Sequence, residues 1–452
     1  MSENEQAITK LIEQSPHQHI KFAIPDIDGV LRGKMIHKGK FLKGLTQGLG
    51  FCDVIFGWDM NDACYNNTTY TGWHSGYPDA FARLDLNTFR TIPWDGHVPF
   101  FLGDFSQDAN ASQLCPRTLL LKTQARCLAM GFSPQFACEY EWFNFKESPQ
   151  SLADKQYVQL QPLTPGMFGY SLLRLSLHQD YFNAIFKQLE AFGIPLEGLH
   201  TETGNGVMEG AILHDTAVNA ADKAILFKQS VKEIAYRHQV MASFMAKWNA
   251  ALPGCGGHIH QSLWDIPQTQ NLFYQPEQGG MSDLMKHYLA GQLYCLPHIL
   301  PMLAPTINSY KRLAGGDWAP ATLTWGVENR TTAFRIIHHT PNTTRIEGRT
   351  SGADANPYLA VAAYLAAGLY GIEHQLPLIS APVQGNGYTD TNAPKLAQNL
   401  LTALQIMEQS EIANTLFGET FVSHFTQTRA WEWRQYERQV SDWELKRYLE
   451  II

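Results

Sequence analysis

Two glutamates stand two positions apart, Glu139 and Glu141, in the alternating segment CEYEWF. On a β-strand, residues two apart point to the same face, so these carboxylates would project together. Close carboxylates repel each other unless a positive charge lies between them, and a divalent cation is the usual solution. Charged residues are mostly exposed, so the pair taken alone favours a solvated face over a metal site.

A second pair, Glu202 and Glu209, flanks the glycine-containing segment GNG in LHTETGNGVMEGAI. Glycines between two strand-like segments predict a tight hairpin, which would bring both carboxylates to one point. GNG is weak evidence for a phosphate-binding loop. Taken alone, this segment favours a surface hairpin.

His258 and His260 follow a run of glycines in GCGGHIHQSLW. Both rings would lie on one face of a strand, where one could bind a metal and the other a nucleotide. A lone histidine is more often structural, and this pair raises the odds only moderately. Since no third histidine or cysteine has the spacing of a zinc site, zinc is disfavoured.

Arginines gather in the later segments NSYKRL, WGVENRTTAFRI and TRIEGRT, as Arg312, Arg330, Arg335 and Arg349. Arginine suits the forked recognition of carboxylates and phosphates, although any one of them is more often part of a structural ion pair. On a strand, Glu347 and Arg349 would share a face. The combined set of five glutamates and a histidine favours Mg²⁺ or Mn²⁺. With the arginines it forms an inventory for phosphoryl transfer without a Walker loop.

Composition limits the class of protein that could hold these residues. The 452 residues carry a net charge of −8 with no basic block, which argues against a nucleic-acid partner. The most apolar segment, 358–371, is too short to span a membrane and predicts a buried helix. The N-terminal sequence shows no signal peptide, and seven scattered cysteines without a CxxC pair favour reduced thiols. A cytoplasmic protein is therefore expected.

The elements that must position these side chains alternate between the two periodicities. Short strands are expected within 20–60 and at 137–145, and helices from Pro116 to about 130, over 179–192 and over 220–246. Further strands are expected at 255–264, 321–328, 333–337 and 344–349, with helices from about 396 to the end. This mixture predicts an α+β fold with an antiparallel sheet and outer helices, with a boundary near 110–117.

In order and spacing, the motifs NSYKRL, WGVENR…FRI, E-x-R…NPYLA and GGHIHQS resemble the glutamine synthetase family, type I-like, from about residue 20 to the end. The resemblance implies an N-terminal β-grasp domain (1–112) and a C-terminal catalytic domain (113–452). It also implies a homo-oligomer, often a dodecamer of two stacked hexameric rings with active sites between subunits. ATP, glutamate and an amine would be the substrates.

Matching motif positions gives each residue an implied role. One metal would be held by Glu141, Glu202 and Glu209, and the second by Glu139, His258 and Glu347. The substrate glutamate would be bound by Gly254, His258, Arg312 and Arg349. Nucleotide and phosphate would be bound by His260, Ser262, Arg330 and Arg335. The implied catalytic residues are Asp59, Arg330 and Arg349, with Asp59 lent to the amine by a neighbouring subunit.

The sequence departs from ammonia-using members at the segment GGDWAP. Where those members carry a glutamate before Ala-Pro, this chain has Trp318, and the adjacent Asp317 would point elsewhere. Pro253 and Gly254 replace an Asn-Gly pair that contacts glutamate. Variants of this kind resemble γ-glutamyl-amine ligases, including γ-glutamylpolyamine synthetases. We therefore expect an organic amine at Trp318, whose indole face could hold an ammonium group, with Trp58, Tyr65 and Trp73 as further candidates for the amine pocket.

Three alternatives stay open on the sequence alone. The first is an ordinary glutamine synthetase that uses ammonia, and Trp318 argues against it. The second is a catalytically silent structural or sensory homologue, which would be expected to lack some of the ligands and arginines that this chain retains. The third is a metal-dependent hydrolase, which would need no nucleotide. No adenylylation is expected at Tyr388, because the surrounding motif does not match.

Overall fold

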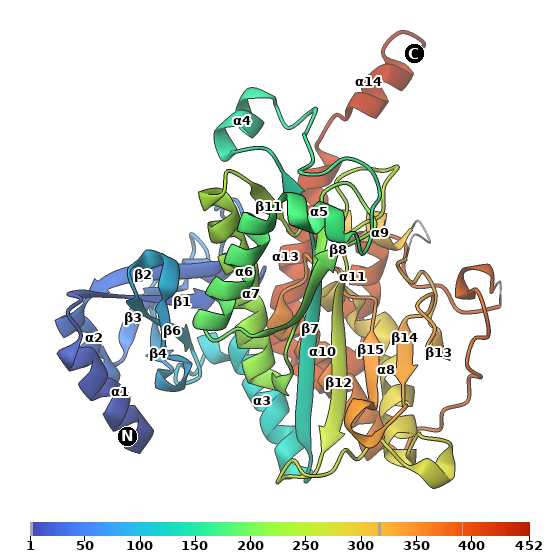
Figure 1. Cartoon of the computed structure of the whole chain (residues 1–452), viewed down its shortest axis with the longest axis horizontal. Coiled ribbons are helices and arrows are strands. Elements are labelled where there is room, and N and C mark those ends of the chain that lie inside the picture. The colour runs from blue at the N-terminus through green and yellow to red at the C-terminus, as the bar shows by residue number, and fades with distance from the viewer. Residues whose placement is uncertain (1–2, 315–317, 391) are drawn as a thin grey trace.

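The computed structural model describes residues 3–314, 318–390 and 392–452. Its strands form two sheets, and the N-terminal one lies to one side of the molecule in Figure 1. That sheet has the order β2-β1-β6-β4-β3, with β5 beside β6. Its strands are β1 (His19–Pro25), β2 (Leu31–His37), β3 (Leu49–Cys52), β4 (Asp79–Leu84), β5 (Arg90–Ile92) and β6 (Val98–Asp104). Two helices accompany it, α1 (Glu3–Gln14) and α2 (Lys38–Gln47).

The larger sheet has the order β13-β14-β15-β12-β7-β9-β8, with β10 and β11 also paired to β7. Its pairs are antiparallel except for β13 and β14. The strands are β7 (Ser133–Phe145), β8 (Leu196–Thr201), β9 (Val207–Ile212), β10 (Asp215–Thr216), β11 (Met241–Ser243), β12 (Gly257–Trp264), β13 (Trp325–Val327), β14 (Phe334–Ile337) and β15 (Arg345–Gly348).

Helices cover one face of this sheet and fill the C-terminal part of the chain. They are α3 (Pro116–Ala129), α4 (Pro149–Asp154), α5 (Leu172–Leu177), α6 (Gln179–Ala191), α7 (Ala217–Arg237), α8 (Asp283–Leu303), α9 (Ile307–Leu313), α10 (Pro357–Glu373), α11 (Leu400–Glu408), α12 (Glu411–Phe417), α13 (Glu419–Glu437) and α14 (Asp442–Tyr448). The last of these projects from the body of the molecule (Figure 1). The predicted α+β class is confirmed.

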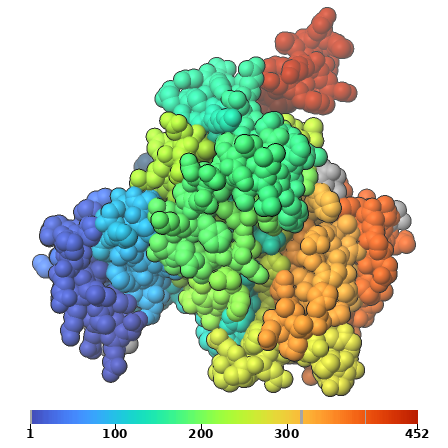
Figure 2. Space-filling view, in the orientation of Figure 1, coloured from blue at the N-terminus to red at the C-terminus, as the bar shows by residue number. Residues whose placement is uncertain are grey.

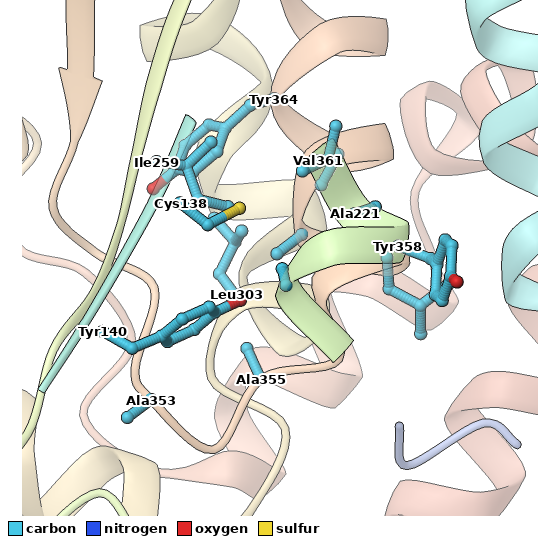
Figure 3. Packing of buried hydrophobic residues seen from close by; sticks show 14 of the residues in the cluster. Cys138, Tyr140, Ala221, Ile259, Leu303, Ala353, Ala355, Tyr358, Val361 and Tyr364 are labelled. Carbon is cyan, nitrogen blue, oxygen red and sulfur yellow. The ribbon is translucent and has the colours of Figure 1, made fainter. Parts of the chain in front are cut away.

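The core explains why the carboxylates of β7 lie on the opposite face of the sheet. Cys138 and Tyr140 are buried, and in Figure 3 they lie with Ile259 of β12 beside the helix that carries Val361. Strand side chains alternate between faces, so the residues between them point away from this core. The predicted buried helix at 358–371 is α10, and its apolar side chains are almost all buried.

The N-terminal sheet is joined to helices α3 and α7 by a buried arginine. Arg117, at the start of α3, makes two hydrogen bonds of 2.9 Å to Asp222 of α7. It also reaches Asp104 of β6 at 2.7 Å and Asp85 at 2.8 Å. The blue and light-blue segments of Figure 2 form a lobe against the rest of the surface. The predicted boundary between residues 112 and 113 stays a prediction.

Most of the expected elements are present, but the helix expected over 220–246 was too long. It ends at Arg237, because the chain turns at Gln239, whose φ is +57°, and then enters β11. All seven cysteines are free thiols. Within the described ranges, none of the helices is long and apolar enough to cross a membrane.

Candidate active site

Four neighbouring strands of the large sheet bring the predicted metal ligands together. In β7 and β12, Glu139 lies opposite His258. In β7 and β9, Glu141 lies opposite Glu209. Directly opposed residues of an antiparallel pair share a face, so this register places all four side chains on one side of the sheet. β15, on the other side of β12, adds Glu347 to the same face.

One cluster combines Glu139, His258 and Glu347, whose ligand atoms all lie within 4.8 Å of one another. His258 Nδ1 is 3.0 Å from Glu139 Oε1 and 3.6 Å from Glu347 Oε1. Adjacent ligands on an octahedral Mg²⁺ are roughly 3 Å apart, because each lies about 2.1 Å from the ion. These three residues, predicted to share a metal, therefore fit one with little movement.

The other predicted trio, Glu141, Glu202 and Glu209, does not form a single group among the described residues; its members fall into two groups that share Glu209, and each group contains a histidine. Glu141 and Glu209 group with His258, while Glu202 and Glu209 group with His200. His200 Nε2 lies 3.1 Å from a Glu209 oxygen. The hairpin of β8 and β9 predicted from the glycines is present. This hairpin brings Glu209 into both of the groups.

The crowding and burial of these carboxylates shift their pKa values. Burial and the negative charges of Glu139 and Glu141 raise the pKa of Glu209, and a hydrogen bond from His200 opposes this. Burial also acts on Glu139, but hydrogen bonds with His258 and His260 hold its pKa well below the usual range. These histidines offset part of the negative charge at Glu139 and Glu209. The donor set is thus suited to divalent cations.

Arg349 connects three parts of the site. Its Nη1 pairs with Glu347, its Nε donates to the backbone oxygen of Arg330 at 3.1 Å, and its Nη2 donates to the backbone oxygen of Trp318 at 3.4 Å. Arg312 is buried and donates to the backbone oxygens of Thr350 and Arg349, both at 3.1 Å. The side chain of Arg330 is exposed.

Arg335 lies between two carboxylates. Its Nη1 is 3.0 Å from Glu347, and its Nε is 3.0 Å from Glu328. Burial lowers the pKa of Arg335, but the two glutamates outweigh this and raise it. A cationic side chain beside the metal cluster is in a position to contact a transferring phosphate.

A pocket of about 390 Å³ extends from Glu139 along β7 and β12. His260 and Ser262 line it together with Trp264 and Arg345, while their predicted contact with a nucleotide stays a prediction. Arg345 Nε donates to His260 Nδ1 at 3.1 Å, which leaves the other ring nitrogen 3.6 Å from Glu139. The pocket therefore runs outward from the metal cluster, as a nucleotide with its phosphates at the metals would require.

Gly254 lies against Arg312, and the backbone oxygen of Trp318 contacts Arg349. A Cβ on Gly254 would lie 2.5 Å from the Ala246 oxygen and 2.9 Å from Arg312, so only glycine fits there. Trp318 has a φ of +63° and is 55% exposed. The neighbouring position 317, considered as a substitute carboxylate, lies outside the described residues.

Asp59 is held by its own chain. One carboxylate oxygen accepts the backbone N–H groups of Asn61 and Ala63, at 2.9 and 3.0 Å, and the other accepts Trp431 Nε1 at 3.0 Å. Among the described residues, these side-chain partners of Asp59 include none of the other predicted site residues of this chain. Its role toward a neighbouring subunit stays a prediction.

The aromatic residues suggested for an amine pocket do not form one surface. Tyr65 is buried edge-on against Trp431, with ring centroids 5.8 Å apart, so it cannot line a pocket within this chain. Trp73 is 78% exposed, and Trp58 stacks with the guanidinium of Arg32.

Sequence reasoning missed three residues of the site, namely His200, Glu328 and Arg345. His200 and Glu202 are two positions apart, the same signal that was used for Glu139 and Glu141. Arg345 and Glu347 show it as well. Glu328 precedes Asn-Arg in a motif from which only the arginines were selected. Their partners come from other strands, which residue spacing could not identify.

Comparisons with known proteins agree with this geometry. Residues 113–448 match the family model of the glutamine synthetase catalytic domain. Over 99% of this chain and 87% of the relative, the sequence is 49% identical to type-1 glutamine synthetase 2 of Dictyostelium discoideum. It is 37% identical to the glutamate–isopropylamine ligase of a Pseudomonas species, over 100% and 99% of the two chains.

A solved structure, the GmaS/ADP complex, superposes with a TM-score of 0.84 at 27% identity, covering 98% of this chain and 99% of that one. Enzymes of the glutamine synthetase family are ATP- and glutamate-dependent ligases that use divalent metals and are typically oligomeric. The match of the catalytic-domain model to most of the chain, together with these relatives, establishes that the protein belongs to the glutamine synthetase family.

Proposed function

We propose that the protein joins the γ-carboxylate of glutamate to an organic amine, either a polyamine or a small monoamine, with ATP as the energy source. The observation that carries this proposal is the cluster of Glu139, His258 and Glu347 with Arg335 and Arg349 directly against it. That arrangement supports phosphoryl transfer to a carboxylate. The replacement of a flap glutamate by Trp318 supports an amine other than ammonia.

The reaction would proceed in two steps. A carboxylate does not react directly with an amine, so ATP first phosphorylates it to γ-glutamyl phosphate, with release of ADP. The amine then attacks the acyl carbon, and phosphate leaves. Two divalent ions, Mg²⁺ or Mn²⁺, would neutralise charge on the phosphoryl oxygens.

The protein's own side chains would bind and orient these substrates. Glu141, Glu202 and Glu209 would hold one ion and Glu139, His258 and Glu347 the other. Arg312, Arg349 and Gly254 would fix the glutamate, with His258 beside it. Arg330 and Arg335 would stabilise the transferring phosphate, and His260 and Ser262 would contact the nucleotide. Asp59 of a neighbouring subunit would accept a proton from the amine.

Trp318 supplies the argument about the amine. An exposed indole can hold an alkyl chain, or an ammonium group over its face with a gain of about 0.5–2 kcal/mol. One relative is named as a glutamate–isopropylamine ligase, which supports an organic amine. The Dictyostelium relative is named as a glutamine synthetase, so ammonia is the competing substrate. We also propose a cytoplasmic dodecamer of two hexameric rings.

The test is ADP release with ATP, Mg²⁺ and glutamate across a panel of ammonium, methylamine, isopropylamine, ethanolamine, putrescine and spermidine. Turnover with an organic amine well above ammonium is expected. Fastest turnover with ammonium would identify an ordinary glutamine synthetase. No turnover with any amine, and no binding of ATP or metal by calorimetry, would identify a silent homologue.

A substitution tests the role of Trp318 directly. Trp318→Glu restores the carboxylate of ammonia-using members, so the ratio of ammonium to organic-amine turnover should rise. Trp443→Glu provides the control, since Trp443 is likewise an exposed tryptophan but lies in α14 and has no proposed role in the site. If Trp318→Glu leaves both activities unchanged, the proposed amine pocket is wrong.

A further inference from the structure

Glu328 comes directly after β13, and its carboxylate binds the Nε and Nη2 side of the Arg335 guanidinium. One oxygen, Oε2, accepts from Nε at 3.0 Å and also from Nη2. The other oxygen, Oε1, lies 2.8 Å from Nε2 of His339. Both carboxylate oxygens therefore have partners, and the side chain is held at two points.

The donors of Arg335 can be counted. A guanidinium has five N–H groups. Two are occupied by Glu328 and one by Glu347, through the 3.0 Å contact of Nη1. Two N–H groups, one on each terminal nitrogen, have no acceptor among the described residues and remain for a further partner. The guanidinium is thus fixed in its plane while its end stays available to a phosphate oxygen.

The backbone at Glu328 is in the left-handed region, with a φ of +52°. A non-glycine residue there is uncommon and is retained where its surroundings fix it, often at functional sites. Its N–H donates to the Ile336 oxygen at 3.0 Å. The next residue, Asn329, donates to the oxygens of Val383 and Gly385, at 3.2 and 2.8 Å. These contacts aim the Glu328 side chain back across the loop at Arg335.

We propose that Glu328 is a positioning residue for phosphoryl transfer, which orients Arg335 so that its two remaining N–H groups meet the transferring phosphate. This inference rests on the proposed function, because it takes Arg335 as a phosphate-binding residue. Glu347 alone would hold one nitrogen and leave the guanidinium free to rotate. Glu328 adds the second point of attachment, and its charge balances Arg335 when no nucleotide is bound.

The variant Glu328→Gly tests the carboxylate, because glycine adopts a positive φ without steric cost. Since misplaced catalytic groups cost on the order of 10- to 100-fold in rate, kcat should fall by roughly that factor. The Kd for ATP with Mg²⁺, measured by calorimetry, should change by less than about 3-fold, because the lost contact serves the transition state. Glu328→Gln keeps an acceptor for Nε and should recover part of kcat.

Gln375→Gly is the matched control, since Gln375 is another left-handed residue (φ +49°) and is exposed just beyond α10. Its kcat should equal that of the wild type. In an Arg335→Ala background, removing Glu328 should cause little additional loss, because its effect acts through the arginine. A merely structural role would instead add its full loss in that background.

Two results would overturn the inference while the proposed function stands. One is a Glu328→Gly enzyme with kcat within about 2-fold of the wild type, whose turnover with ATP, glutamate and an amine is normal. The other is a double variant, lacking both Glu328 and Arg335, whose fold loss in kcat equals the product of the losses in the two single variants. A wild-type protein that neither binds nor hydrolyses ATP with any amine would overturn the proposed function, and this inference with it.

Discussion

Replacing His258 should remove one bound metal ion and leave the other. His258 belongs to two of the groups of metal-ligating side chains, whereas Glu202 belongs only to the group at the other end of the site. In His258→Ala, Glu139 and Glu347 keep their carboxylates but lose the nitrogen 3.0 Å from one and 3.6 Å from the other. An ion bound there would then have two protein ligands in place of three.

The size of the effect follows from the ligand count. Loss of even an indirect partner of a metal ligand weakens binding by about 10- to 100-fold, and loss of a direct ligand should cost at least that much. This equals about 1.4–2.7 kcal/mol. Calorimetric titration of the metal-free protein with Mn²⁺ should show two sites per chain in the wild type and a single strong site in His258→Ala. Glu202→Ala should weaken the other site.

His374→Ala is the control, because His374 is an exposed histidine at the C-terminal end of α10 and belongs to none of the metal-capable groups among the described residues. It should retain both sites in the absence of nucleotide. If His258→Ala binds two Mn²⁺ ions with unchanged affinity, or if His258→Ala and Glu202→Ala weaken the same single site, the assignment of two separate ligand sets is wrong.

Arg117→Met leaves the buried Asp222 without its cationic partner, which should lower the free energy of unfolding by about 3–5 kcal/mol in urea titrations; a loss below about 1 kcal/mol would contradict the buried network. Burial lowers the pKa of Lys228 from 10.5 to about 7. Between these two pH values the unfolded chain binds a proton that the folded chain lacks, so the free energy of unfolding should rise with pH, by at most about 5 kcal/mol. Urea titrations near pH 7 and pH 9.5 should show this rise in the wild type but not in Lys228→Met. An equal change in the free energy of unfolding with pH in both proteins would contradict this assignment. Arg349→Lys cannot reach Glu347 and the backbone oxygens of Arg330 and Trp318 at once, so KM for glutamate should rise at least about tenfold in steady-state assays; an unchanged KM would show that Arg349 does not bind glutamate.

Local patterns were sufficient to predict the strands and helices that carry the site. The alternation in CEYEWF predicted β7, and Pro116 predicted the start of α3, because both signals depend on neighbouring residues. The end of α7 was missed, since residues beyond Arg237 have helical composition but pair with β7 instead. That pairing depends on a strand almost one hundred positions away.

The site shows the same division between local and long-range information. Period-two spacing correctly placed Glu139 with Glu141 on one face, and the glycines correctly predicted the hairpin of β8 and β9. Residue spacing does not give the order of strands in a sheet. It therefore could not predict the contact between His200 and Glu209 or the ion pair between Glu328 and Arg335. The grouping of residues into metal sites came from the family resemblance.

The residues proposed for phosphoryl transfer and those proposed to face the amine lie on different kinds of structure. His258 and all the metal-site carboxylates except Glu202 lie on paired strands of one sheet, whereas Trp318 and Asp59 lie on connecting loops. Loops accept substitutions and insertions that a paired strand does not. The choice of amine can therefore diverge within a lineage while the activation of glutamate is inherited unchanged. An enzyme with this layout is a suitable starting point for directed evolution toward new amines, with libraries confined to the two loops.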